Sequence, residues 1–274
     1  TPELGREFYT SDGTEEGTVL LKDLKPGDTR NRIHHIPIIV NDVMLFSGHD
    51  KTLGEVIWGS DGTEEGTTVL FDLSPETSNE IYAPYLTQAG NVAYFLANDG
   101  VHGEELWITD GTEGGTRMVA DIAPDAADSF AYPRVGAGGS LFFSAIDGEH
   151  GFEPWFTDGT EGGTRMLADL VEGSENSNVG NAYFAPDGTL YCFADNNVHG
   201  SEPYIADPGG LNFRLLKEIN PEAAGSNPGE FFFYKDRVYF RANSNVIGTE
   251  MWVTDGTIDG TVPFRDIEGA SGSY

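Results

Sequence analysis

A motif that recurs every 48 or 49 residues constrains this chain more than any other feature. Its clearest copy is EELWITDGTEGGT at residues 104–116, where an acid, an aromatic residue and a Gly/Thr-rich turn follow in order. A fixed period of this length is typical of structural units joined in series, so we expect one domain over residues 1–274. The aromatic anchors of the copies are Tyr9, Trp58, Trp107, Trp155, Tyr204 and Trp252.

Each module reads as four short strands. In residues 82–130 the strand-like runs are 84–90, 92–98, 104–110 and 116–122, separated by Gly-Asn, Asp-Gly and Asp-Gly-Thr turns. Apolar residues nowhere follow a helical spacing in this module. A four-stranded antiparallel sheet repeated at this period is typical of a β-propeller blade, so the sequence predicts an all-β propeller.

The number of blades is open at this stage. The hairpin of the third and fourth strands occurs six times, whereas the apolar second strand occurs five times, so five and a half modules are present. We favour a ring of six positions with one incomplete blade, and a five-bladed ring with a docked hairpin is the alternative. The incomplete module leaves strand edges that a partner copy could fill, so self-association through this half-module is a hypothesis beside that of a monomer.

The Asp-Gly-Thr segment is interpreted as a structural turn. Its Asp can accept hydrogen bonds from the following amides, its Gly supplies a positive φ, and its Thr residues tie the loop together. We expect the anchor aromatics to pack between sheets. The turn acids are Asp12, Asp61, Asp110, Asp158 and Asp255.

The string Glu-Leu-Trp-x-x-Asp-Gly-Thr-x-x-Gly-Thr, present almost letter for letter at residues 105–116, resembles the bacterial repeat family named for it. Six copies extend the resemblance over essentially the whole chain. It implies a propeller-like module of secreted or surface-attached proteins, and it implies no reaction. The fifth copy departs from the pattern, because Pro208 and Gly209 replace the Gly-Thr pair.

A second recurring group precedes each anchor. An Asp eight residues before it and a Glu two residues before it flank a Gly-containing turn, and carboxylate and carbonyl oxygens are the ligands that Ca²⁺ prefers. The spacing matches no EF-hand loop, so hydrogen bonding within the hairpin is the competing interpretation. The candidate calcium ligands are Asp50, Asp99, Glu105, Asp147 and Glu153.

A basic segment interrupts the acidic chain at residues 30–35. Arg30, Arg32, His34 and His35 lie in a connecting loop and are candidate contacts for an anionic ligand, with an ordinary exposed loop as the alternative. His102, His150 and His199 recur five residues before their anchors, but turns at mid-radius would keep three such imidazoles apart.

Charge limits the partners. The chain has 15 Lys plus Arg against 45 Asp plus Glu, a formal net charge of −30. A nucleic-acid backbone would be repelled, and no 18-residue apolar run is present to insert in a membrane. Cys192, the single cysteine, lies in an apolar run and is expected to be buried.

These features predict a non-catalytic, extracellular or cell-surface propeller. It would act as a binding or structural module toward an extracellular protein or polysaccharide. Two alternatives remain open: a polysaccharide-active enzyme, glycosidase or lyase, with channel-facing carboxylates, and a multivalent lectin that would need exposed aromatic platforms.

Calcium binding can be tested by thermal unfolding at fixed ionic strength. If the recurring acids bind Ca²⁺, we expect the midpoint to rise by several degrees with Ca²⁺ and not with Mg²⁺, because a ligand that binds only the folded state stabilises it. An equal midpoint with Ca²⁺ and with excess chelator would show that the acids are ordinary turn residues.

Overall fold

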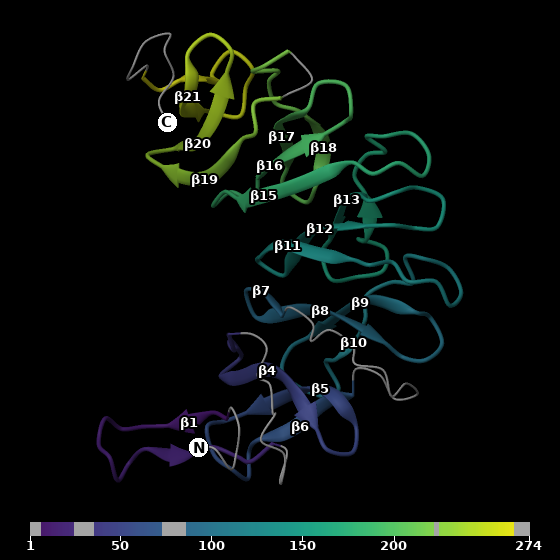
Figure 1. Ribbon diagram of the computed structural model, residues 1–274, viewed down its shortest axis with the longest axis vertical. Coiled ribbons are helices and arrows are strands. Elements are labelled where there is room, and N and C mark those ends of the chain that lie inside the picture. The colour runs from purple at the N-terminus through teal and green to yellow at the C-terminus, as the bar shows by residue number, and fades with distance from the viewer. Residues whose placement is uncertain (1–6, 25–35, 73–85, 222–224, 266–274) are drawn as a thin grey trace. The chain divides into compact units, whose positions relative to one another are not determined.

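The computed structural model describes residues 7–24, 36–72, 86–221 and 225–265 (Figure 1). All regular structure in these ranges is β-strand, arranged as antiparallel sheets. The predicted all-β class is therefore confirmed, and five four-stranded sheets are consistent with a propeller-like fold. The described residues include no helix long and apolar enough to cross a membrane.

The chain divides into two compact units, residues 1–133 and 134–274. The first unit begins with a two-stranded hairpin of β1 (Tyr9–Thr10) and β2 (Val19–Leu20). Two four-stranded sheets follow it. Their strands are β3 (Ile38–Val40), β4 (Val43–Asp50), β5 (Gly54–Ser60) and β6 (Thr68–Asp72), then β7 (Thr87–Ala89), β8 (Val92–Asn98), β9 (Glu104–Thr109) and β10 (Arg117–Met118).

The second unit holds three sheets, the first of which starts just before the boundary. In each sheet the strands pair in chain order. They are β11 (Tyr132–Ala137), β12 (Ser140–Ala145), β13 (Glu153–Thr157) and β14 (Arg165–Met166); β15 (Asn178–Phe184), β16 (Leu190–Asp195), β17 (Ser201–Asp207) and β18 (Leu211–Leu215); and β19 (Gly229–Tyr234), β20 (Arg237–Ser244), β21 (Gly248–Thr254) and β22 (Val262–Pro263).

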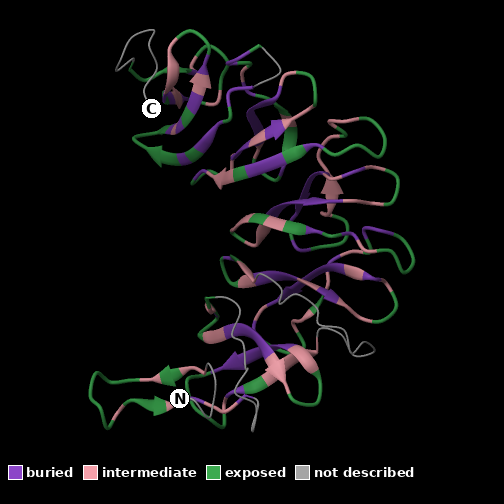
Figure 2. Cartoon of the chain, in the orientation of Figure 1, coloured by how far each residue is buried: buried purple, intermediate pink, exposed green. Residues whose placement is uncertain are grey.

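The four strands expected at residues 84–122 are present, although the outer two are shorter than the sequence suggests. The first covers only Thr87–Ala89 and the fourth only Arg117–Met118. The second and third strands are the long, buried ones (Figure 2). Burial of both faces explains their nearly continuous apolar sequences.

The anchor aromatics lie at one register position in every sheet. Trp107 pairs with Phe95 and Trp155 with Phe143, each across the second and third strands. The anchors of the four-stranded sheets are 4–9% exposed, as expected for packing between sheets. In the first unit, Trp107 and Phe95 join Ile57 of the preceding sheet in one core cluster. Neighbouring sheets are therefore held together by the anchor of one and the third strand of the other.

The Asp-Gly-Thr turn is a closed hydrogen-bond network. Asp110 Oδ1 accepts from the Thr112 amide at 2.9 Å and from Thr112 Oγ1 at 2.7 Å. The Gly115 amide donates to Thr112 Oγ1 at 3.0 Å, and Thr116 Oγ1 donates to the Thr112 carbonyl at 2.7 Å. Gly111 has a φ of 92°, which a residue with a Cβ rarely adopts. The same Asp contacts occur at Asp12, Asp61, Asp158 and Asp255.

The fifth turn differs, as its Pro208-Gly209 sequence suggests. Asp207 accepts a hydrogen bond from Asn212 Nδ2 at 2.7 Å and one from Arg214 Nη1 at 3.0 Å. The pairing of β17 with β18 also shifts register between Ile205 and Asp207. Side chains of the fourth strand thus replace the Thr hydroxyls as partners of the acid.

Two adjacent glycines of one turn provide a matched test. A Cβ on Gly115 would overlap the Asp110 carboxylate, whereas a Cβ on Gly114 would meet no atom within 4 Å. We expect Gly115→Ala to lower the free energy of unfolding by about 1–3 kcal/mol, and Gly114→Ala to change it by less than about 0.5 kcal/mol. Denaturant unfolding of both variants measures this, and equal effects would contradict the turn geometry.

Candidate functional site

In two successive modules the recurring acid and histidine meet at the turn between the second and third strands. Asp99 Oδ1 accepts hydrogen bonds from the amides of Val101 and His102, both at 2.9 Å, and Asp99 Oδ2 lies 2.7 Å from His102 Nδ1. The next module repeats this turn, with Asp147 Oδ2 2.9 Å from His150 Nδ1. The aspartate thus stabilises the backbone of the turn and holds the orientation of the imidazole ring.

These contacts shift the pKa of both partners. Burial acts to raise the pKa of Asp99, but hydrogen bonds from His102 and Val101 outweigh it, so the pKa is lowered. The hydrogen bond to Asp99 raises the pKa of His102 against a smaller effect of burial, and the charge of Asp121 adds to the rise. The Asp147–His150 pair is shifted in the same directions. Each pair therefore favours an imidazolium beside a carboxylate.

The acid at the end of the fourth strand also faces the histidine, a contact that the sequence analysis did not foresee. His150 Nε2 lies 3.8 Å from Asp169 Oδ2, and His199 Nδ1 lies 2.6 Å from Glu218 Oε1. The two residues of each pair are 19 positions apart in the sequence, so local spacing did not reveal the contact. They meet because the hairpin of the third and fourth strands returns the chain to the same turn. The histidine and this acid recur at the same 19-residue spacing in successive modules, and that constant spacing could have indicated the contact.

In three successive modules the Glu two residues before the anchor is buried and bonded to the backbone. Glu105 accepts from the amides of Ile122 at 3.2 Å and Ala123 at 3.0 Å. Glu153 accepts from Leu170 and Val171 in the equivalent way. Each of these carboxylates joins the third strand to the chain that leaves the fourth strand. Glu202 does so at Ile219 and Asn220 and also accepts from Ser226 Oγ.

Burial dominates the titration of these glutamates. It raises the pKa of Glu105 to about 7, even though hydrogen bonds from Ala123, Ser129 and Ile122 act to lower it. Burial raises the pKa of Glu153 and Glu202 as well. A raised pKa also suits a general acid, but a buried carboxylate that repeats in successive modules and is bonded to two amides acts as a clamp.

The candidate calcium ligands are spread over several sheets. Asp50, like Asp99, accepts hydrogen bonds from its own turn, with the Thr52 amide at 2.7 Å and the Leu53 amide at 3.0 Å. Glu105 and Glu153 are turned inward to the backbone. Among the described residues no group of three or more His, Cys, Asp or Glu side chains is placed to hold a metal ion. The candidate anion contacts Arg30, Arg32, His34 and His35 lie outside the described residues.

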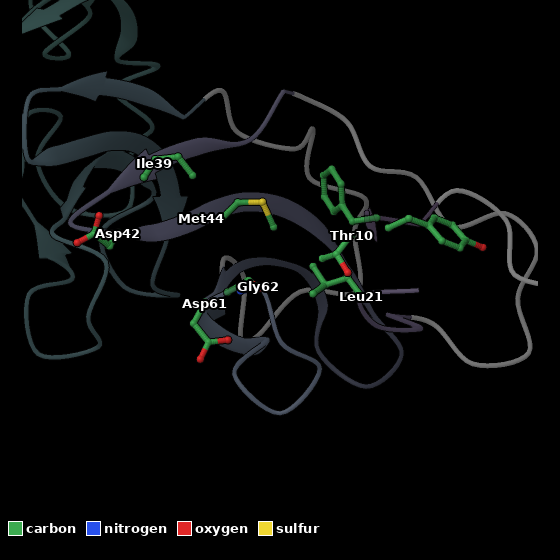
Figure 3. Close-up of a pocket in the computed structure, with 10 residues that line it drawn as sticks. Thr10, Leu21, Ile39, Asp42, Met44, Asp61 and Gly62 are labelled. Atoms are coloured by element: carbon green, nitrogen blue, oxygen red, sulfur yellow. The ribbon is translucent and has the colours of Figure 1, made fainter. Parts of the chain in front are cut away.

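One shallow cavity of about 270 Å³ lies in the first unit, between the β1–β2 hairpin and the sheet that follows it (Figure 3). Its wall is mainly apolar and includes Phe8, Leu21 and Met44. Asp61 and Gly62 of a structural turn line another side. The cavity is smaller than a usual ligand pocket, and it marks where the short hairpin covers its neighbour incompletely.

Comparisons with solved structures identify the fold. A mutant of puromycin hydrolase complexed with PGG matches 97% of this chain and 42% of its own, with 16% identity and a TM-score of 0.51. Prolyl oligopeptidase B from Galerina marginata, bound to a 35mer hydrolysis and macrocyclization substrate, matches 94% of this chain and 36% of its own, with 12% identity and a TM-score of 0.51. The matched structures are peptidase β-propeller domains.

A third solved structure comes from a study of two prolyl endopeptidases and the role of inter-domain dynamics in their catalysis and specificity. It matches 81% of this chain and 32% of its own, with 14% identity and a TM-score of 0.52. The chain thus spans less than half the length of the solved proteins it matches. No protein-family model and no curated protein matches it.

The functional prediction made from the sequence was wrong. It described a non-catalytic extracellular binding or structural module, with a polysaccharide-active enzyme and a lectin as alternatives. The solved proteins of matching fold are peptidases. The lectin alternative also fails on its own terms, because Trp58, Trp107, Trp155 and Trp252 are buried and offer sugars no exposed platform. At 12–16% identity the similarity establishes the fold alone.

The buried glutamate predicts a pH dependence of stability. Because folding raises the pKa of Glu105 from 4.5 to about 7, its stabilising contribution is full below pH 4.5 and is lost as the pH rises through 7. Glu105→Gln removes this titration. Its stability relative to the unmodified chain should therefore rise by on the order of 3 kcal/mol between pH 4.5 and pH 8.

Denaturant unfolding at several pH values measures this difference. Glu113→Gln, at an exposed position in the Asp-Gly-Thr turn of the same module, removes one charge without touching the clamp and controls for net charge. A stability difference that is constant with pH would show that Glu105 does not titrate in this range.

Proposed function

We propose that this chain is the propeller part of a peptide hydrolase. Its role would be to admit and position peptide or small amide substrates for a catalytic domain outside residues 1–274. The observation that carries the proposal is the fold match over 97% of this chain to 42% of puromycin hydrolase. The study of prolyl endopeptidases names inter-domain dynamics as a factor in catalysis and specificity, which is the kind of role proposed for this chain.

The use of the repeated residues supports this role. The recurring Asp turns, the buried glutamates and the anchor aromatics all have structural partners within the sheets. Substrate selection would therefore depend on overall charge and on the loops that depart from the repeat. A formal net charge of −30 favours neutral and cationic peptides over acidic ones.

The repeat also supports a finer architecture and a family. We propose a ring of six blade positions, in which β1–β2 is the third and fourth strand of an incomplete blade, because it carries the full Asp-Gly-Thr turn. The six copies of the motif support membership of the Glu-Leu-Trp-x-x-Asp-Gly-Thr repeat family. Both statements rest on the sequence motif.

Binding of short peptides tests the proposal. Three peptides of equal length, one neutral with a central proline, one cationic and one acidic, would be titrated into the chain by calorimetry. We expect the neutral peptide to bind, and the cationic peptide to bind on the order of tenfold more tightly than the acidic one at low ionic strength. The neutral peptide should keep its affinity when salt is added.

Two results would overturn the proposal. If only the cationic peptide binds, and its binding disappears at physiological salt, the binding is nonspecific electrostatic attraction and the chain selects no peptide. If the chain by itself cleaves a fluorogenic peptide, its own residues carry the reaction and the positioning role is wrong.

A further inference from the structure

The first unit contains a complete interface between neighbouring sheets, where the β3–β6 sheet meets the β7–β10 sheet. Ala93 of β8 is buried in one core cluster with Val40 and Leu45, which belong to the first and second strands of the preceding sheet. Gln88 Nε2 donates to the carbonyl of Ile39 at 2.6 Å. The first two strands of one sheet therefore form part of the surface against which the next sheet packs.

The turns of the second of these sheets also contact the first sheet. Asn41 Nδ2, between β3 and β4, donates to the carbonyls of Asn91 at 3.2 Å and of Asp110 at 3.0 Å. A Cβ on Gly111 would lie 3.3 Å from the Cβ of Val43. The Asp-Gly-Thr turn of one module is thus held against the first and second strands of the module before it.

The cavity in the first unit lies at the same place one module earlier (Figure 3). Five residues of its wall hold the positions whose counterparts, 49 residues later, make the contacts just described. They are Ile39, Asp42, Met44, Asp61 and Gly62. A Cβ on Gly62 would meet no described atom within 4 Å, in contrast to Gly111. The cavity therefore occupies the space that the first and second strands of a preceding module would fill.

The β1–β2 hairpin supplies the opposite wall, and one edge of β1 has no partner among the described strands. β1 pairs with β2 alone, whereas the third strands β5 and β9 each pair on both sides. The amide of Leu21 donates to the carbonyl of Phe8 at 2.9 Å, so the backbone of Phe8 faces β2. Backbone groups alternate along an antiparallel strand, and those of Tyr9 therefore face the other edge. Such an edge beside an apolar cavity is a template for strand addition.

The strands of the other modules already have their places. Each strand from β3 to β22 belongs to a four-stranded sheet in which the strands pair in chain order. The residues that fill the corresponding space one module later are Val40, Val43 and Leu45. Positions 49 residues before these three fall before Thr1, so residues 1–274 hold no counterparts of them. A β segment that completes the first sheet would have to come from elsewhere.

We propose that the cavity and the open edge of β1 form a seat for a two-stranded β segment from polypeptide outside residues 1–274. The second strand of this segment pairs with β1 at Tyr9, and its apolar side chains enter the cavity between Leu21 and Met44. The inference rests on the proposed assignment of β1–β2 to an incomplete blade, and it is independent of the proposed peptide role.

The contacts one module later define the chemistry of the segment. Its turn carries a donor equivalent to Asn41, because the carbonyls of Asp42 and Asp61 hold the places of the two carbonyls that Asn41 bonds. Its second strand presents apolar side chains to Met44, since the wall of the cavity is mainly apolar. Carboxylates on this side of the segment are excluded, because they would meet the acids Asp42 and Asp61.

A chain that carries its own copy of such a segment tests the proposal. Thr1 is the counterpart of Asp50, so a second copy of residues 37–49 placed directly before Thr1 continues the repeat in register. We expect the unfolding midpoint of this fused chain to rise by several degrees, because the segment covers the apolar wall. Exchange of the Tyr9 amide should slow on the order of tenfold or more, because its N–H gains a partner.

A matched fusion distinguishes seating in the cavity from a general effect of added residues. Val40→Ser, Val43→Ser and Leu45→Ser are made in the added copy alone, which keeps its length and its turn. The unfolding midpoint and the exchange of the Tyr9 amide should then equal those of the unmodified chain.

A change in the wall of the seat tests the same contact from the other side. Ile39→Glu at the original position should remove the gain in midpoint of the apolar fusion, because it puts a charge against the added strands. Val101→Glu, at a 64% exposed position in a turn of the β7–β10 sheet, is its control and should keep the gain.

Two results would overturn the proposal. The first is an apolar fusion that unfolds and exchanges like its Ser-substituted control. The second is self-association of the unmodified chain that the fusion abolishes, measured by sedimentation, because the seat would then be filled by a second copy of this chain. Neither result changes the peptide titration described above, so the two proposals fail separately.

Discussion

The contact between one sheet and the next is the interaction on which this structure depends. A four-stranded antiparallel sheet with two apolar faces is unstable in water unless both are covered. Within each unit an anchor aromatic covers the neighbouring sheet, as Trp107 does against Ile57 and Trp252 does against Ile205. This requirement explains the period of 48 or 49 residues in the sequence, because every sheet must present an anchor of the same kind at the same place.

Hydrogen bonds to carboxylates hold each sheet in the shape that this contact needs. Asp110 closes the tight turn between the third and fourth strands, and Glu105 ties the third strand to the chain beyond the fourth. Asp110 is partly exposed and its pKa is lowered, whereas Glu105 is buried and its pKa is raised. The same residue chemistry thus stabilises the module in two environments. The acidic composition owes part of its excess to this repeated structural use.

Regularity in this chain is a property of its fold. Residues that recur in most modules, such as Glu105 and Glu153, have partners in their own sheet. The sequence interpretation treated them as candidate metal ligands because carboxylate type and spacing were all it could use. The functional prediction failed for a related reason. A repeat motif describes how modules pack, so the similarity in fold to solved peptidases became apparent only from the three-dimensional structure.

The sequence by itself determined the period, the all-β class, the strand order within a module and the identity of the anchors and turns. These follow from local rules: alternation and apolar runs, turn chemistry at Asp-Gly-Thr, and repetition. Only the tertiary structure decided that His150 meets Asp169 and that Glu105 is a buried clamp. Those facts depend on which segments fold back on one another, and this is not encoded in the local sequence patterns of a single module.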